Sequence, residues 1–237
     1  MTFDAQNITL FDTNQAMTAA LVADACAVLS AAGPCSLLLS GGSSPCDFYT
    51  ALGQEDMNWS DIHIALVDER WVDEDDDGSN AALVKRSLMA GHAAQAKFSP
   101  MKNAALTPHQ GEAELDRQYR LLPTPALSVL GMGPDKHTAS WFSDAAEYEI
   151  VSRADAPLLV GGLTAPQTPV TGAYLQRMTI TGNMLAMSRK AYLIIKGDNK
   201  IDLLRDCLAS PANASPIGRA AAILGQRLQI FALQGEG

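Results

Sequence analysis

Three segments of the sequence, residues 36–45, 62–70 and 126–137, each begin as a short apolar run and end abruptly in a polar turn. The turns read SGGSSP, DER and GMGPDKH, and each carries glycine or charged residues. Apolar runs of four to six residues bounded by turn residues are typical of strands buried on both faces of a parallel sheet. Because ligands bind beyond the carboxyl ends of such strands, the pattern predicts that these three turns meet at one edge of a sheet.

Helical patterning alternates with strand patterning along the rest of the chain. This alternation predicts an α/β fold, with a mainly parallel Rossmann-like open sheet that carries helices on both faces. We find no internal repeat, low-complexity tract or clear linker, so we expect a single domain over residues 1–237. The remaining strands are expected at 8–11, 98–101, 149–153, 177–181, 191–195 and 228–233, and the helices at 17–32 after Asn14 as N-cap, 47–52, 80–90, 109–121 and 198–208. The Gly-, Thr- and Pro-rich segment 161–174 is expected to be a loop with the character of a lid or crossover.

Composition and charge restrict the partners and the location. Residues 1–10 alternate apolar with polar residues, and no run of eighteen apolar residues occurs. We therefore expect neither a signal peptide nor a membrane span, and predict a cytoplasmic protein. The formal net charge of -9 argues against a nucleic acid or an anionic membrane as partner. We expect a small-molecule substrate and a monomer or small homo-oligomer; a phosphorylated substrate would require cations gathered locally.

Several kinds of catalytic site are not indicated. The cysteines, Cys26, Cys35, Cys46 and Cys207, lack CxxC spacing and are expected to be reduced thiols in or near the core. No HExxH motif or paired-histidine ligand set occurs, so neither a metal nor a cofactor is predicted. The acidic run 73–77 lacks the spacing of a calcium loop and is interpreted as solvated surface. Without a GxSxG motif, a covalent acyl-enzyme is not indicated.

Each of the three polar turns has both a functional and an ordinary interpretation. In SGGSSP, paired glycines allow backbone N–H groups to point inward before a helix start, which suits an anion such as phosphate. An ordinary strand–helix turn with a serine cap fits equally well. Asp68-Glu69-Arg70 offers a carboxylate pair and an arginine that could orient a sugar hydroxyl or polarise a carbonyl. On local sequence alone, a solvated loop is favoured for that turn.

The third turn holds the most informative histidine. His137 lies between a glycine turn and an expected helix start, where a general base can face a ligand. Asp135 could fix the tautomer of its imidazole, and Thr138 or Ser140 could cap the following helix. The alternative is a capped turn with an incidental surface histidine. A lone histidine with nearby carboxylates suits proton transfer to water or from a sugar carbon.

Taken together, these segments resemble the 6-phosphogluconolactonase family, within a wider group that includes glucosamine-6-phosphate deaminases. Each motif is weak alone, but their order along nearly the whole chain is specific. The matching segments are SGGSSP at 40–45, DERWV at 68–72 with SN at 79–80, GMGPDKHTAS at 131–140, RMTIT at 177–181, KGDNK at 196–200 and SPIGRA at 215–220.

The resemblance implies roles for particular residues. His137 matches the general base of the family, and Arg70 matches an arginine that faces the substrate. Asp68 lies at the position that serves as acid or base in the deaminases. The positions that hold the sugar phosphate are matched by Gly42, Ser43, Ser44, Arg177 and Lys200. The last two would bring cations to the glycine loop from late in the chain.

The implied reaction is hydrolysis of 6-phospho-D-glucono-1,5-lactone to 6-phospho-D-gluconate in the oxidative pentose phosphate pathway, by His-assisted attack of water. Deaminases typically continue from the histidine with IAFNEP, whereas this chain continues with TASWFS at 138–143, which is closer to the lactonases. Two alternatives remain: an amino-sugar-phosphate deaminase or isomerase with Asp68 as base, and a non-catalytic regulator that binds a sugar phosphate.

The sequence departs from the family pattern at two positions. Lys136 stands where the family usually has glycine before the histidine, and Ser143 stands where proline is common. If position 136 requires a positive φ, lysine there costs on the order of 1 kcal/mol. We expect Lys136 to add positive potential at the mouth of the site.

Overall fold

A computed structural model of the chain describes residues 8–235, so the first seven and last two residues of the expected domain lie outside it. Its centre is a seven-stranded sheet in which every neighbouring pair is parallel. The strand order is β1 (Ile8–Phe11), β10 (Leu228–Leu233), β9 (Lys190–Lys196), β6 (Pro125–Leu130), β2 (Cys35–Leu39), β3 (Ile62–Leu66) and β5 (Lys97–Ser99). Every residue of β2 and β6 is buried, as their continuous apolar runs require. The predicted α/β fold is confirmed.

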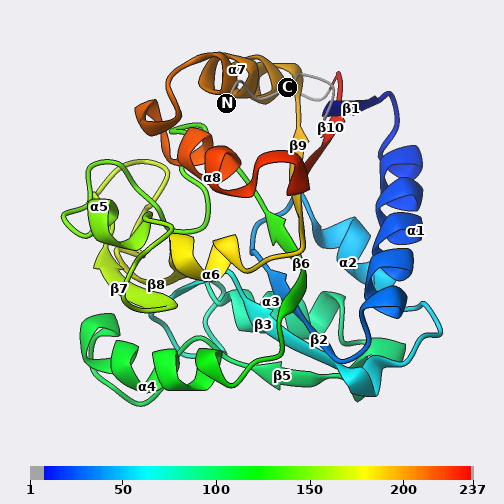
Figure 1. Cartoon of the computed structure of the whole chain (residues 1–237), viewed down its shortest axis with the longest axis horizontal. Coiled ribbons are helices and arrows are strands. Elements are labelled where there is room, and N and C mark those ends of the chain that lie inside the picture. The colour runs from blue at the N-terminus through cyan, green and yellow to red at the C-terminus, as the bar shows by residue number, and fades with distance from the viewer. Residues whose placement is uncertain (1–7, 236–237) are drawn as a thin grey trace.

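Helices cover both faces of this sheet (Figure 1). In that view α1 (Asn14–Ala32) and α2 (Cys46–Leu52) lie to the right of the central strands. To their left lie α6 (Gly182–Ala186) and α8 (Pro216–Leu224), with α7 (Asp198–Ala209) above β9. The buried apolar side chains between these layers form one connected hydrophobic core. The other helices are α3 (Asn80–Ser87), α4 (Pro108–Arg120) and the single turn α5 (Tyr148–Val151).

The chain reverses its direction across the sheet between β2 and β6. From β2 it proceeds to β3 and β5 toward one edge, and then returns to β6, from which β9 and β10 follow toward the other edge. Such a reversal leaves a crevice at the carboxyl ends of the two central strands, which is where open α/β sheets bind ligands. The turns after β2 and β6 are the two glycine-bearing segments identified in the sequence.

A second, three-stranded antiparallel sheet consists of β4 (Asp68–Arg70), β8 (Gln176–Ile180) and β7 (Val160–Thr164). The turn expected at 68–70 is therefore a strand. The loop expected at 161–174 is a strand in its first four residues and a loop only from 165 onward. Position 162 of β7 requires glycine because α4 packs closely on it: a Cβ on Gly162 would lie 2.7 Å from the backbone of Pro108.

Several expected boundaries are wrong. Thr13, not Asn14, is the N-cap of α1, because its hydroxyl accepts the N–H of Ala16 at 3.2 Å. Residues 149–153, expected as a strand, lie in and after α5. No helix follows His137; instead Thr138 forms a β-bridge with Trp141. The short helix α6 and the helix α8 were not predicted.

Helix α1 alone, among the described residues, is long and apolar enough to cross a membrane, with a mean hydropathy of 1.5. In the structure α1 covers the sheet. Its residues Met17, Leu21, Ala25 and Leu29 are buried in the core.

Candidate active site

A cavity of about 230 Å³ opens at the carboxyl ends of β9, β6, β2 and β3. These four strands are neighbours in the sheet, so the segments that follow them converge although they are far apart in sequence. Eight of the residues expected at the site line this cavity: Gly42, Ser43, Ser44, Asp68, Arg70, His137, Arg177 and Lys200. Asp135 and Lys136 lie outside the lining.

The glycine loop after β2 forms one wall of the cavity. Gly42 has φ 90°, a conformation that favours glycine. Gly41 is required for a different reason: a Cβ there would lie 1.8 Å from Oδ1 of Asn80. The amide of Asn80 lies against the loop and donates to the carbonyl oxygen of Asp68 at 2.8 Å. The hydroxyl of Ser40 is buried and has no hydrogen-bond partner within residues 8–235.

Alternation along β4 separates the two carboxylates that the sequence places side by side. Asp68 and Arg70 line the cavity, whereas Glu69 accepts the backbone N–H groups of Asn80 at 2.7 Å and Ala81 at 2.8 Å. Glu69 therefore holds the start of α3, and burial raises its pKa to about 7. The expected carboxylate pair does not act as a pair. Only Asp68 faces the site.

Two arginines lie directly opposite each other across the β4–β8 ladder. Arg70 and Arg177 are register partners, and both line the cavity. Like charges in such a pair destabilise a sheet unless an anion lies between or beside them. Arg177 is only 5% exposed, and its burial lowers its pKa to about 10, against the opposing effect of Asp68. Such an arrangement of charges is typical of a site for an anionic ligand.

The contacts of the two guanidinium groups leave donors free. Nη1 of Arg70 donates to the carbonyl oxygen of Gly78 at 2.6 Å, and Nε of Arg177 donates to that of Tyr174 at 2.7 Å. Nε of Arg70 is buried, with no partner in the described part of the chain. Lys200, in the first turn of α7, adds a third cation to the lining. These three cations provide, inside the cavity, the local positive charge that an anionic ligand requires in a protein of net charge -9.

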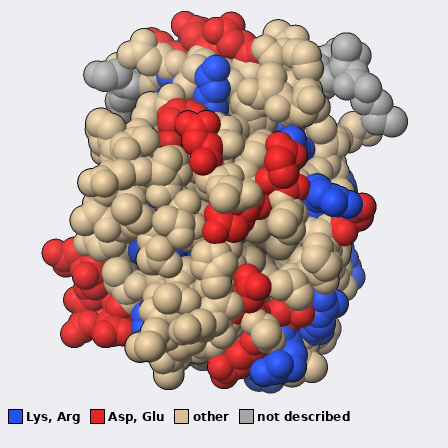
Figure 2. All heavy atoms as spheres, turned by 90° about the vertical axis from the view of Figure 1, so that its left-hand side faces the viewer, with Lys and Arg blue, Asp and Glu red and all other residues tan. Residues whose placement is uncertain are grey.

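The protein as a whole remains acidic outside this cavity. Figure 2 shows one face of the molecule, on which acidic groups are scattered widely and basic groups are fewer and gather mainly along the right-hand side. Such a surface provides no continuous basic band on that face for a polyanion. The cations that matter for a small anion are those inside the cavity.

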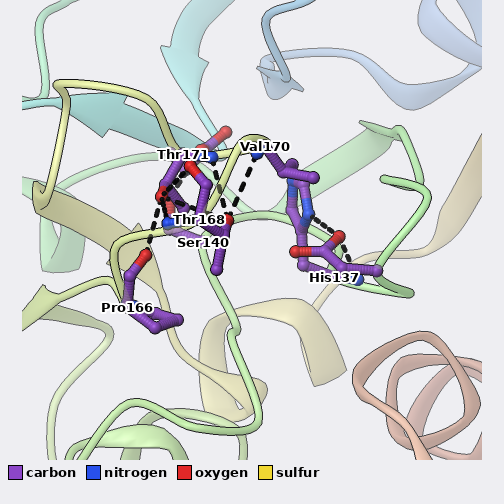
Figure 3. A network of polar contacts seen from close by, with 8 residues as sticks. His137, Ser140, Pro166, Thr168, Val170 and Thr171 are labelled. Atoms are coloured by element: carbon purple, nitrogen blue, oxygen red, sulfur yellow. Dashed lines mark hydrogen bonds and ion pairs between the residues drawn. The ribbon is translucent and has the colours of Figure 1, made fainter.

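His137 lies in a tight turn after β6. The N–H of Lys136 donates to the carbonyl oxygen of Gly133, and the N–H of Gly133 donates to that of His137, both at 3.0 Å. Nδ1 of His137 is hydrogen-bonded to Oδ1 of Asp135 (Figure 3). Burial acts to raise the pKa of Asp135, but the hydrogen bond and charge of His137 and the backbone hydrogen bonds together outweigh it, and the pKa is lowered. An ionised Asp135 accepts the proton of Nδ1, which leaves Nε2 as the basic nitrogen.

Two residues close to His137 in the sequence have strained backbone. Lys136 has φ 70° and Ala139 has φ 50°, so position 136 is left-handed, as the glycine usual at this position suggested. The carbonyl oxygen of Lys136 accepts the N–H of Ile217 at the start of α8 at 3.2 Å, which helps to hold this conformation. The side chain of Lys136 is exposed.

Ser140 has a different contact from the one expected. It does not cap a helix; its buried hydroxyl donates to Oδ2 of Asp68 at 2.7 Å. Its N–H donates to the hydroxyl of Thr179 at 3.2 Å. Ser140 thus connects the His137 turn to the carboxylate of the cavity.

Sequence reasoning missed several lining residues. Asn80 and Ser40 lie in motifs that were recognised, but neither was assigned to the site. Phe142, whose ring centroid lies 4.6 Å from that of His137, and Val170 were not identified at all. Val170 belongs to the loop 165–174, in which Thr168 and Thr171 form a local hydrogen-bond network (Figure 3). The sequence suggested a lid or crossover for this segment, but it did not indicate that Val170 lines the cavity beside the histidine.

The acidic run 73–77 is only partly the solvated surface that was expected. Oδ1 of Asp76 accepts the hydroxyl of Tyr174 at 2.9 Å and the N–H of Gly78 at 2.7 Å.

Among the residues that the structure describes, no group of three or more His, Cys, Asp or Glu is placed to hold a metal ion. Cys35 and Cys207 are buried, and Cys26 and Cys46 are partly buried, as free thiols.

Known proteins are similar to this chain in sequence and in fold. The family model described as glucosamine-6-phosphate isomerases/6-phosphogluconolactonase matches residues 11–228. The 6-phosphogluconolactonase of Rhizobium meliloti is 34% identical over 231 residues, which cover 95% of this chain and 97% of the relative. That of Pseudomonas aeruginosa is 36% identical over 182 residues, 76% of this chain and 74% of the relative. The crystal structure of a 6-phosphogluconolactonase from Shewanella baltica superposes with a TM-score of 0.86 at 34% identity, covering 95% of this chain and 97% of that chain.

The matched segment includes the glycine loop, β4, the His137 turn and the cations that together line the cavity. The chain therefore belongs to the glucosamine-6-phosphate isomerase/6-phosphogluconolactonase family.

Proposed function

We propose that this protein is a 6-phosphogluconolactonase, which hydrolyses 6-phospho-D-glucono-1,5-lactone to 6-phospho-D-gluconate. The relatives named above carry that activity in their names, and they match over most of the chain. The observation that carries the proposal here is the Asp135–His137 pair, with its imidazole in the wall of a cavity that also holds two arginines. Such a cavity offers one base and several anion-binding groups to the same ligand.

His137 acts as the general base. Because Asp135 holds the proton on Nδ1, Nε2 is free to accept a proton from a water molecule as that water attacks C1 of the lactone. The C1 carbonyl becomes a tetrahedral oxyanion. When the bond between C1 and the ring oxygen breaks, the proton on Nε2 passes to the ring oxygen, and the acid product is formed without a covalent enzyme intermediate.

Arg70 stabilises the oxyanion. A donor that is already fixed and desolvated before reaction is more effective than one that must reorient during it. Nη1 of Arg70 is fixed by the carbonyl oxygen of Gly78, and its buried Nε has no partner among the described residues. Asp68, held by Ser140, is placed to accept a sugar hydroxyl and to balance the charge of Arg177.

The phosphate is held by Gly42, Ser43, Ser44, Arg177 and Lys200, which all line the same cavity. The positive φ of Gly42 supports this assignment, because it allows consecutive backbone N–H groups to point to the same side. The two late cations reach the cavity because β8 and α7 begin beside it. A cytoplasmic location remains a prediction from the sequence.

The test is turnover of freshly generated 6-phosphogluconolactone, followed by acid release, with the spontaneous hydrolysis rate subtracted. We expect turnover well above that background, and no ammonia from glucosamine 6-phosphate. Ammonia release without lactone turnover would support the deaminase alternative instead. Binding of 6-phosphogluconate with neither reaction would support a non-catalytic regulator.

A further inference from the structure

Tyr174, at the end of the loop 165–174, contacts both arginines of the cavity. Its ring lies under the guanidinium group of Arg70, whose carbon is 5.9 Å from the ring centroid. Its carbonyl oxygen accepts the N–H of Nε of Arg177 at 2.7 Å. Tyr174, which lies just before β8, therefore contacts both of the arginines that lie opposite each other in the β4–β8 ladder.

Tyr174 is itself fixed from the other side. Its hydroxyl donates to Oδ1 of Asp76 at 2.9 Å, and the same oxygen accepts the N–H of Gly78 at 2.7 Å. The ring packs so closely on Gly78 that a Cβ there would lie 2.6 Å from Cζ of Tyr174. The carbonyl oxygen of Gly78 in turn accepts Nη1 of Arg70 at 2.6 Å. Asp76, Gly78, Tyr174 and Arg70 thus form a closed set of contacts.

This arrangement addresses a physical difficulty of the site. Two arginines opposite each other repel, and a long side chain has several rotamers of similar energy, so without other contacts their guanidinium groups would separate. Burial and repulsion together disfavour the charge on Arg177. Contacts on the sides away from the cavity hold the two groups close while leaving other donors free for a ligand.

We propose that Tyr174 is a positioning residue for the two cavity arginines: its ring and carbonyl oxygen hold Arg70 and Arg177 in the orientation that binds the substrate, and Asp76 fixes Tyr174 through its hydroxyl. The inference rests on the proposed lactonase function only for the identity of the ligand. It also assigns a role to the acidic loop 73–77, whose Asp76 acts on the site through Tyr174 and not by touching the substrate.

The first test uses variants that remove one contact at a time. Tyr174→Phe removes the hydroxyl but keeps the ring and the carbonyl, so the loss is one hydrogen bond. We expect kcat/KM for the phosphorylated lactone to fall about 3- to 10-fold, the effect of a hydrogen bond of about 1 kcal/mol. Tyr174→Leu also removes the aromatic face and should cost about 10- to 100-fold. Asp76→Ala should resemble Tyr174→Phe.

The matched control is Asp75→Ala. It removes a carboxylate from the same loop, but Asp75 is exposed and contacts neither Tyr174 nor an arginine. If Asp75→Ala lowers kcat/KM as much as Asp76→Ala, the effect is general electrostatics and the proposal is wrong. The proposal is also wrong if Tyr174→Phe and Tyr174→Leu both stay within about 2-fold of the parent, because lost contacts of this kind are worth more.

A double-mutant cycle separates positioning from a merely structural role. In an Arg70→Lys background the planar guanidinium group is gone, so Tyr174→Leu should cost less than about 2-fold further if it acts through Arg70. An undiminished effect in that background would mean that Tyr174 acts elsewhere. Thermal unfolding of each variant identifies any loss of fold.

Binding of 6-phosphogluconate, measured by calorimetry, decides the inference independently of turnover. The Kd should rise about 3- to 10-fold in Tyr174→Phe and remain unchanged in Asp75→Ala. If the parent binds 6-phosphogluconate but shows no lactone turnover, the proposed function fails while these Kd values still test Tyr174. Equal Kd values for parent and Tyr174→Phe would overturn the inference even in an active lactonase.

Discussion

The imidazole of His137 is held by residues within a few positions of it in sequence. Asp135 binds Nδ1, Phe142 lies beside the ring, and Gly133 closes the turn through two backbone hydrogen bonds. A general base needs both the correct free nitrogen and a fixed direction, since misplacement of a catalytic group by about 1 Å is costly. For the proposed base, the short turn provides both from one segment.

Gly133→Ala should disturb this arrangement. A Cβ at Gly133 would lie 2.2 Å from Cε1 and Nδ1 of His137, and 2.5 Å from Oδ1 of Asp135. Because both groups must move, we expect kcat to fall at least about 10-fold, with the thermal unfolding temperature little changed. Steady-state kinetics and circular dichroism measure the two quantities. A variant with parental kcat would show that the orientation of His137 is not critical.

Lys136 allows the cost of its left-handed backbone to be measured. Lys136→Gly and Lys136→Ala both remove the charged side chain, but only glycine adopts φ 70° without strain. We expect the glycine variant to be more stable than the alanine variant by about 1 kcal/mol in urea unfolding. Equal stability would mean that φ at this position relaxes.

Lys136→Gly also tests the expected charge at the mouth of the cavity. The exposed side chain lies outside the cavity lining, so its effect on an anionic substrate would act through solvent and be sensitive to salt. We expect a higher KM with a weaker salt dependence. An unchanged KM and salt dependence would show that the charge of Lys136 does not contribute to substrate binding.

The alternating side chains of strand β4 contact both the cavity and the start of helix α3. Asp68 and Arg70 point to the cavity, while Glu69, which is 2% exposed, points to the first turn of α3. The strand thus positions catalytic candidates and the start of a helix at once. Asn80 at that start then reaches back to the carbonyl oxygen of Asp68.

Glu69 should make stability depend on pH. Burial raises its pKa to about 7, from 4.5, so near pH 6 the folded protein holds a proton that the unfolded chain has lost. The contribution of the protonated Glu69 carboxyl to stability is fully present below about pH 4.5 and is lost as the pH rises through 7. The parent should therefore lose stability relative to Glu69→Gln between those pH values in urea unfolding. A parent that gains stability relative to Glu69→Gln as the pH rises from 4.5 to 7 would contradict the raised pKa.

The elements that the sequence predicted well are those with strong, long patterns. The buried strands β2, β3 and β6 and the helices α1, α4 and α7 lie within a few residues of their expected positions. Residues 149–153 were misassigned because α5 is one turn long, and its buried residues Tyr148 and Val151 show the helical spacing only once. The glycines of β7 suggested a loop, but Gly162 is there to let α4 approach.

At the scale of the whole molecule, the site is a product of topology. The switch between β2 and β6 brings their two turns together, and β3 and β9 on either side add Asp68, Arg70 and Lys200. Strand-end motifs made this much of the cavity predictable. Val170, Phe142 and the contacts of Tyr174 were not predictable, because they depend on how the second sheet and its loop pack against the first.

Net charge and local charge have opposite signs in this protein, and this should appear in the kinetics. A chain of net charge -9 repels an anionic substrate at long range, while Arg70, Arg177 and Lys200 attract it inside the cavity. Buried and partly buried cations are screened less by salt than exposed ones, so KM for the phosphorylated lactone should rise only on the order of 2- to 5-fold between low and high salt. KM for unphosphorylated gluconolactone should not change. An equal response of both lactones would argue against a phosphate site.

The role of His137 as the general base is tested by the turnover of His137→Ala beside that of His92→Ala. His92 is exposed, and its side chain is not part of the cavity, so its replacement controls for loss of a histidine. We expect His137→Ala to lower kcat for 6-phosphogluconolactone by about 10²- to 10⁴-fold, the usual effect of a general base, with its fold intact. His92→Ala should retain parental kcat. A folded His137→Ala variant with near-parental kcat would contradict the assignment of His137 as the base.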